Sequence, residues 1–259
     1  MRFDHAIIAV SDLEVATADF EKLGFTVLFG GEHAGGLTHN ALVTFADGTY
    51  LEVMAPTDPG LLREPSKPGP GNYLFLFDAG EGFAGLALHT NDLDAVVERV
   101  RRNGIEIADP AAGGRRRTDG VELAWRTAFP MGSVSPFFIT DENPRELRVR
   151  TEPELTTHPN GAIGITQILS LVTNLEEGVA RYSILLGEES TPGPDFEGAE
   201  TAAFEVGSVE AAIAAPDHQE GLLAEHLVSR GEGPFQITIQ SDQSGSIHSH
   251  GARIELIGK

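Results

Sequence analysis

The chain of 259 residues contains no cysteine. Disulfides, thiolate nucleophiles and zinc–thiolate sites are therefore excluded. No apolar run is long enough to span a bilayer, and the N-terminus lacks the basic and apolar regions of a secretion signal. These absences predict a soluble, cytoplasmic protein without a membrane partner.

Basic residues are also scarce, with 18 Lys and Arg against 39 Asp and Glu, which gives a net charge of -21. A field of that sign repels polyphosphates and anionic lipids, so neither nucleic acid nor a membrane surface is an expected partner. The hydrophobic share of 41% is typical of a globular protein. The length suffices for one large domain or two smaller ones.

What the chain does contain is a weak internal repeat. In the first copy, an apolar strand at 3–10 precedes a helix that begins near Asp12, and strands near 25–29, 41–45 and 50–54 follow. The strand and helix recur in a second copy from Gly85, with Asp92 at the helix start, and in a third copy from Ile165, with Asn174 at the helix start. A fourth copy, over 235–257, lacks the helix.

This repeat predicts an α+β fold of tandem βαβββ modules that pair into curved mixed sheets, with the fourth module truncated. We expect modules one and two to form a first domain over 1–150, and modules three and four a second, degenerate domain over 160–259. A different pairing, of module one with module four, is an alternative. Pairing within one chain or between two chains also remains open, and the second case would produce a homodimer.

His5 and Glu52 each lie in an apolar strand of module one. A carboxylate in such a strand is costly unless something compensates its charge. A divalent metal shared with the imidazole is one compensation. The alternative is a buried acid held by an arginine or by backbone donors, beside a hydrogen-bonded core histidine.

The sequence resembles the vicinal oxygen chelate superfamily and, within it, the glyoxalase-like domain proteins. The residues that carry this resemblance are Phe3 to Leu13, Asn40 to Leu42, Gly48 to Glu52, Arg116 to Gly120, Trp125-Arg126, Pro136 to Ile139 and His158 to Gly161. The resemblance implies a glyoxalase/dioxygenase-like fold of paired modules. It also implies a divalent metal held by His, Gln and Glu on the first and last strands of each module, chelating two oxygens of a small substrate.

The ligand positions differ between the four modules. Module one supplies His5 and Glu52, whereas modules two and three lack at least one ligand, and module four supplies Gln236 and Glu255. Pairing of modules one and four would therefore gather a site of His5, Glu52, Gln236 and Glu255, suited to Zn, Ni, Mn, Fe or Co. Pairing of modules one and two would leave only His5 and Glu52, and the metal would be weak or absent.

Three functions follow from these alternatives, the third being an interaction or structural module whose cleft is vestigial. The first is a metal-dependent lyase, isomerase or dioxygenase that acts on a small oxygen-bearing substrate, with Glu52 as ligand and catalytic residue. The second is a metal-free small-molecule binding protein, similar to bleomycin resistance proteins, that uses the same cleft.

Five further side chains are candidates for substrate binding. The arginine run Arg115 to Arg117 suits a carboxylate or enolate on so acidic a chain, and Arg116 and Arg117 are its candidates. A solvated hairpin tip with surface ion pairs is the alternative. Trp125, the only tryptophan, forms either core or a cleft wall. His39 and His89 are candidate hydrogen-bond partners of a substrate, with a surface or turn position as the alternative.

Overall fold

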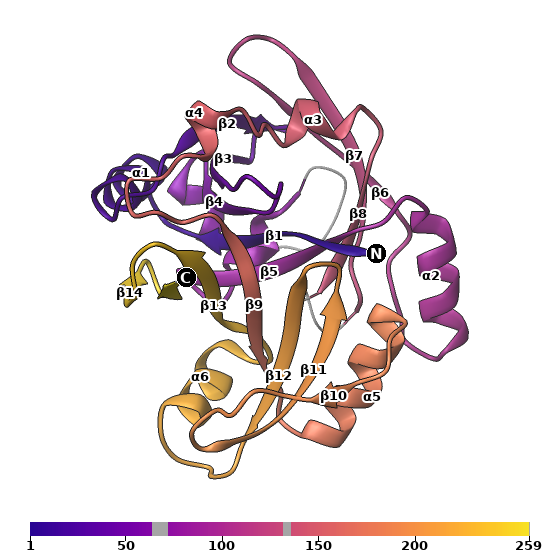
Figure 1. The fold of residues 1–259 in the computed structure, drawn as a ribbon. Coiled ribbons are helices and arrows are strands. Elements are labelled where there is room, and N and C mark those ends of the chain that lie inside the picture. The colour runs from indigo at the N-terminus through magenta and orange to yellow at the C-terminus, as the bar shows by residue number, and fades with distance from the viewer. Residues whose placement is uncertain (64–71, 132–135, 259) are drawn as a thin grey trace.

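The computed structural model describes residues 1–63, 72–131 and 136–258. Its strands form two sheets, a closed barrel of eight strands and an open sheet of seven (Figure 1). Within the described ranges, no helix has the length and apolar character needed to cross a membrane.

Modules one and two together form the closed barrel, in the order β1-β4-β3-β2-β6-β7-β8-β5. Strand β1 (Arg2–Ala9) pairs in parallel with β4 (Tyr50–Pro56) and antiparallel with β5 (Gly82–His89). The barrel closes on its other side where β2 (Leu28–His33) meets β6 (Ala111–Arg116). The remaining barrel strands are β3 (Thr38–Thr44), β7 (Glu122–Ala128) and β8 (Phe137–Asp141).

Modules three and four form the open sheet, in the order β10-β11-β12-β9-β13-β15-β14. No helix separates β13 from β14 in this described part of the chain, so the truncation of the fourth module and the fold class are confirmed. The strands of this sheet are β9 (Gly164–Leu171), β10 (Thr191–Pro192), β11 (Ala199–Val206), β12 (Val209–Pro216), β13 (Gly233–Ser241), β14 (Gly245–Ser249) and β15 (Ala252–Gly258).

The three predicted helix starts are confirmed. The side chains of Asp12, Asp92 and Asn174 each accept a hydrogen bond from a backbone N–H in the first helical turn. Each cap satisfies donors that the helix itself leaves unpaired. The helices they begin are α1 (Leu13–Lys22), α2 (Leu93–Arg102) and α5 (Leu175–Leu186).

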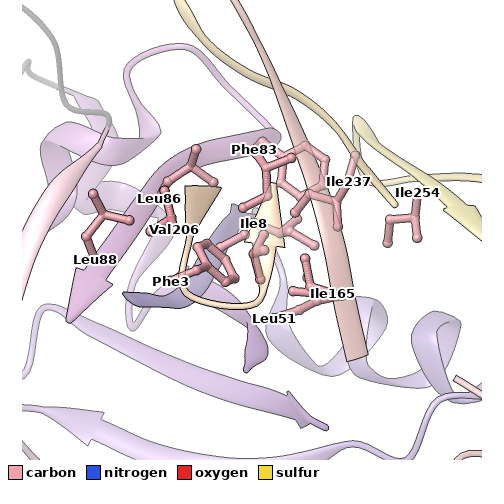
Figure 2. Close-up of a cluster of buried hydrophobic side chains, with 14 of the residues drawn as sticks. Phe3, Ile8, Leu51, Phe83, Leu86, Leu88, Ile165, Val206, Ile237 and Ile254 are labelled. Carbon is pink, nitrogen blue, oxygen red and sulfur yellow. The ribbon is translucent and has the colours of Figure 1, made fainter. Parts of the chain in front are cut away.

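The barrel and the open sheet share one hydrophobic core, part of which Figure 2 shows. Phe3, Ile8 and Leu51 point outward from the barrel and meet Ile165 and Ile237 of the open sheet. The barrel strands come from residues 2–141 and the sheet strands from residues 164–258. The division into domains at 1–150 and 160–259 stays a prediction.

Several elements differ from the sequence-based expectation. Strand β2 begins at Leu28, not at residue 25, because the N–H of Thr26 donates to Nδ1 of His158 instead of to a neighbouring strand. Strand β6 was not expected because it contains two glycines. Gly113 is required there, since a Cβ at this position would lie 2.3 Å from Nε1 of Trp125. The remaining elements are η1 (Pro59–Arg63), η2 (Leu74–Phe77), α3 (Arg145–Arg148), α4 (Pro153–Thr156) and α6 (Leu222–Arg230).

Candidate functional site

The interior of the barrel holds a small cavity, which we call the barrel cavity. Because side chains alternate along a strand, β1 and β4 each turn every second residue inward, among them His5 and Glu52. The cavity has a volume of about 30 Å³, which is room for about one or two water molecules. Its lining residues are His5, Ile7, His33, Asn40, Leu42, Tyr50, Glu52, Met54, Tyr73, Arg115, Trp125, Thr127, Phe137, Ile139 and Arg148.

Glu52 is the centre of a buried hydrogen-bond network in this cavity. Its Oε1 accepts a hydrogen bond from Nδ2 of Asn40 at 2.6 Å and lies 3.3 Å from Nε2 of His33. Its Oε2 lies 3.2 Å from Nε2 of His5. Burial alone would raise the pKa of Glu52, but the hydrogen bonds from His33 and His5 hold it well below its usual range. Glu52 is therefore an ionised carboxylate whose two oxygens already have donors.

His5 lies between two carboxylates. Its Nδ1 is 2.8 Å from Oδ2 of Asp4, and its Nε2 faces Glu52. Burial alone would lower the pKa of His5, but the hydrogen bonds with Asp4 and Glu52 raise it. A carboxylate only accepts hydrogen bonds, so the two carboxylates that face the ring nitrogens of His5 favour the doubly protonated ring, an imidazolium. It stacks on Tyr50 with 4.5 Å between ring centroids.

Asp4 links this network to two arginines of α3. Oδ2 of Asp4 lies 2.8 Å from Nη1 of Arg148, and Oδ1 lies 2.7 Å from Nη2 of Arg145. Asp4 has no exposed surface, so burial alone would raise its pKa, yet Arg148 and His5 lower it well below the usual range. The sequence alternative of an arginine-held acid concerned Glu52, but the arginines pair with Asp4, beside the histidine.

Arg115 enters the cavity from β6. Its side chain is 5% exposed, and its Nη1 donates to Oδ1 of Asn40 at 2.9 Å. The approach requires a glycine on the neighbouring strand, because a Cβ at Gly30 would lie 1.9 Å from that nitrogen. Asn40 thereby bridges the guanidinium of Arg115 to the carboxylate of Glu52.

The opposite wall of the cavity is apolar and comes from module two. Trp125, Phe137 and Ile139 line it. Nε1 of Trp125 donates to the hydroxyl of Tyr73 at 3.2 Å. Gly85, the counterpart of His5, faces this wall, since a Cβ there would meet the ring of Phe137 at 3.3 Å. Module two thus supplies no side chain that could ligate a metal at the positions of His5 and Glu52.

The four residues expected to hold a metal are not brought together. His5 and Glu52 lie in the barrel, whereas Gln236 and Glu255 lie on β13 and β15 of the open sheet, because module one pairs with module two. Over residues 1–63, 72–131 and 136–258, no group of three or more His, Asp or Glu could hold a metal ion. The donors of His5 and Glu52 are turned toward each other, so the residues present do not fit the metal that the superfamily implies.

The residues expected to bind substrate are scattered. Trp125 lines the cavity and also belongs to a buried hydrophobic cluster, so it is both core and cavity wall. Arg116 is exposed, and Arg117 donates to Asp119 and to the carbonyl of Leu147.

Two expected histidines lie outside the barrel cavity. His89 pairs with Asp141 at 3.2 Å, since the end of β5 lies beside β8. His39 packs its ring against Phe29.

Sequence reasoning did not select several polar residues of the cavity, among them His33, Asn40 and Arg115. His33 and Asn40 lie on β2 and β3, whereas the search for ligands considered only the first and last strands of each module. Arg115 belongs to the arginine run considered for carboxylate binding, but Arg116 and Arg117 were selected from it. The alternation of β6 decides which of them faces inward, and that strand was not expected.

Comparison with known proteins places this geometry in a family. A family model described as a glyoxalase-like domain matches residues 3–186. A hypothetical protein from Staphylococcus aureus is 18% identical, with a TM-score of 0.78 and 99% of each chain covered. A mutant of 4-hydroxymandelate synthase from Streptomyces coelicolor is 15% identical, with a TM-score of 0.60, over 93% of this chain and 72% of that one. No curated protein matches the chain significantly.

Proposed function

Because the chain belongs to the glyoxalase-like domain family, within the vicinal oxygen chelate superfamily, we propose that its barrel cavity binds a small organic molecule without a resident metal ion. The observation that carries this proposal is the buried network of Asp4, His5 and Glu52 beside an apolar wall. Burying such charges is costly. Convergent polar groups with shifted pKa values in an apolar cavity are typical of binding sites.

The network assigns roles to its members. Glu52 has both oxygens in hydrogen bonds and a low pKa, so we infer that it positions His5 and His33 and does not act as a base. The imidazolium of His5 and the guanidinium groups of Arg115 and Arg148 are the cationic groups that line the cavity beside it. The apolar rings of Trp125 and Phe137 are placed to cover the carbon part of a ligand.

The size of the cavity restricts the ligand to a few heavy atoms. A drug-sized molecule needs roughly 300–1,000 Å³, far more than the barrel cavity offers. We therefore propose a ligand of only a few heavy atoms, larger than bound water and much smaller than a drug-sized molecule.

The competing function is the metal-dependent lyase, isomerase or dioxygenase. It needs further ligands from the paired module, and that module supplies Gly85, Phe137 and Ile139 near the cavity. His5, His33 and Glu52 turn their polar atoms toward one another, and the described residues contain no group of three His, Asp or Glu that could hold a metal ion. The residue types around the cavity therefore favour binding without a metal.

The test combines metal analysis with ligand binding. The purified chain is loaded with Zn, Ni, Mn, Co or Fe, desalted and analysed, and binding of small acids, amides, alcohols and ketones is then measured in chelator. We expect metal well below one ion per chain, and a change of Trp125 fluorescence with at least one probe class. Near-stoichiometric metal that is lost in Glu52→Gln but kept in Glu255→Gln would overturn the proposal.

A further inference from the structure

A second cavity adjoins the barrel cavity on the side of Arg115, and we call it the arginine mouth. It has a volume of about 110 Å³ and shares the side chains of Leu42, Arg115 and Arg148 with the barrel cavity. Arg117 and Arg150 also line it. Four of the 18 basic residues of a chain with net charge -21 thus surround one small opening.

Three of these arginines already have carboxylate partners. Arg117 pairs with Asp119, Arg148 pairs with Asp4 and Asp141, and Arg150 pairs with Glu152 at 2.8 Å. Asp119 is the acid that lines the mouth, and it is held by Arg117.

Arg115 differs from the other three arginines. Among residues 1–63, 72–131 and 136–258, no carboxylate lies within 4.0 Å of its guanidinium. Its one hydrogen bond to a described side chain is to the neutral amide of Asn40. A buried charge without a close counter-ion is costly, and Glu52 acts on it only across that amide. The structure therefore holds one buried cation in excess at the boundary between the two cavities.

We propose that the ligand is a small organic acid whose carboxylate is bound by Arg115 at this boundary. The inference rests on the proposed function and specifies its ligand class. The planar fork of a guanidinium matches the two oxygens of a carboxylate. The mouth admits the acid against the repulsive field of the whole chain, and the carbon part then extends toward Trp125 and Met54 in the barrel cavity.

The experiment uses the full chain in chelator, with the fluorescence of Trp125, the only tryptophan, as the readout. The probes are propionate, its neutral analogue propionamide, and inorganic phosphate. We expect propionate to bind at least tenfold more tightly than propionamide and phosphate. Arg115→Met should weaken the binding of propionate at least tenfold and leave the binding of propionamide unchanged.

The matched control is Arg126→Met. Arg126 lies on β7 between the inward-facing Trp125 and Thr127, and its side chain points outward to pair with Asp94 and Glu142. Its replacement should change propionate binding less than twofold. If Arg115→Met does not fold, Arg115→Lys is the second variant, because it keeps the charge but removes the planar fork of the guanidinium. Its affinity for propionate should be at least threefold lower than that of the wild type.

The outcomes separate this inference from the proposed function. Equal binding of propionate and propionamide would overturn the carboxylate assignment while leaving a metal-free binding site. Phosphate that binds as tightly as propionate would overturn it as well. If no small molecule of any class binds, the proposed function itself fails.

Discussion

The barrel and the open sheet are built from the same repeat but differ in what they bury. Between its strands the barrel encloses the Asp4, His5 and Glu52 network, which faces a cavity. The open sheet packs apolar side chains on the face opposite the shared core, where α6 covers it. The residues of that apolar cluster are Leu169, Leu171, Ala203, Ala212, Ala214, Leu223 and Phe235.

This difference shows that the repeat does not need buried charges to fold. Gln236 and Glu255, at the ligand positions of module four, are only partly buried, and Glu255 accepts a hydrogen bond from the hydroxyl of Ser246. Buried ion pairs often contribute no net stability compared with well-packed apolar residues. The charged interior of the barrel therefore supports the proposal that the cavity binds a ligand.

The largest expected difference between the two regions is in their tolerance of a lost carboxylate. Asp4→Asn leaves Arg145, Arg148 and His5 without their shared counter-ion, and we expect the free energy of unfolding to fall by about 3–5 kcal/mol. Glu255→Gln in the open sheet should cost about 0.5 kcal/mol or less. Urea unfolding at neutral pH measures the free energy of unfolding of both variants. Equal losses would show that the barrel and the open sheet do not differ in their tolerance of a lost carboxylate.

A smaller effect is expected from glycine replacement. Gly30→Ala would place its Cβ 1.9 Å from Nη1 of Arg115 and 2.1 Å from Oδ1 of Asn40. Overpacking of this kind costs about 1–3 kcal/mol. At Gly245, in β14 of the open sheet, an added Cβ would meet nothing within 4 Å, so Gly245→Ala should be neutral or gain about 0.5 kcal/mol. Thermal unfolding of the two variants gives the comparison.

The pH dependence of stability should have opposite signs for a histidine of each region. The folded-state pKa of His5 is raised, so its contribution is complete below the unfolded value of about 6.5 and is lost as the pH rises. Burial lowers the pKa of His226 to about 4, so its contribution is present above about 6.5 and is lost as the pH falls.

His5→Gln and His226→Gln test these signs. The difference in unfolding free energy between wild type and His5→Gln should shrink from roughly pH 6 toward pH 9, because the folded state then loses the proton that it binds more tightly. For His226→Gln the corresponding difference should shrink as the pH falls from about 6.5 toward 4. Two differences that change in the same direction would show that the barrel does not hold His5 as an imidazolium.

The smallest effect is expected at the position in the open sheet that corresponds to His5. Gln167 donates to Oε1 of Glu210 at 2.8 Å on an exposed surface. Gln167→Ala should therefore change the free energy of unfolding by about 0.5 kcal/mol or less. A loss of stability as large as that of Asp4→Asn, measured in the same urea titration, would show that the open sheet also depends on a polar network.

Local patterns predicted a large part of this architecture. Asp12, Asp92 and Asn174 were identified as helix starts because capping depends on neighbouring residues only. The closeness of His5 and Glu52 followed from the modular repeat, since β1 and β4 pair within module one.

The pairing of modules was not predictable in the same way. It depends on long-range contacts such as the short β2–β6 ladder, in which Glu32 lies opposite Arg116 and His33 opposite Arg115. No local pattern encodes such a ladder. The same ladder fixes the register that turns Arg115 inward, which explains why Arg116 and Arg117 were selected instead.

The central claim is that the barrel holds His5 as an imidazolium between two carboxylates, and not as a metal ligand. The charge and partners of the His5 ring test this claim most directly. Nitrogen NMR of the ring at neutral pH, assigned with His5→Gln, reports whether each nitrogen carries a proton. We predict two protonated nitrogens whose signals do not move when zinc or nickel is added. A neutral ring, or a metal-dependent shift of its Nε2 signal, would contradict this claim.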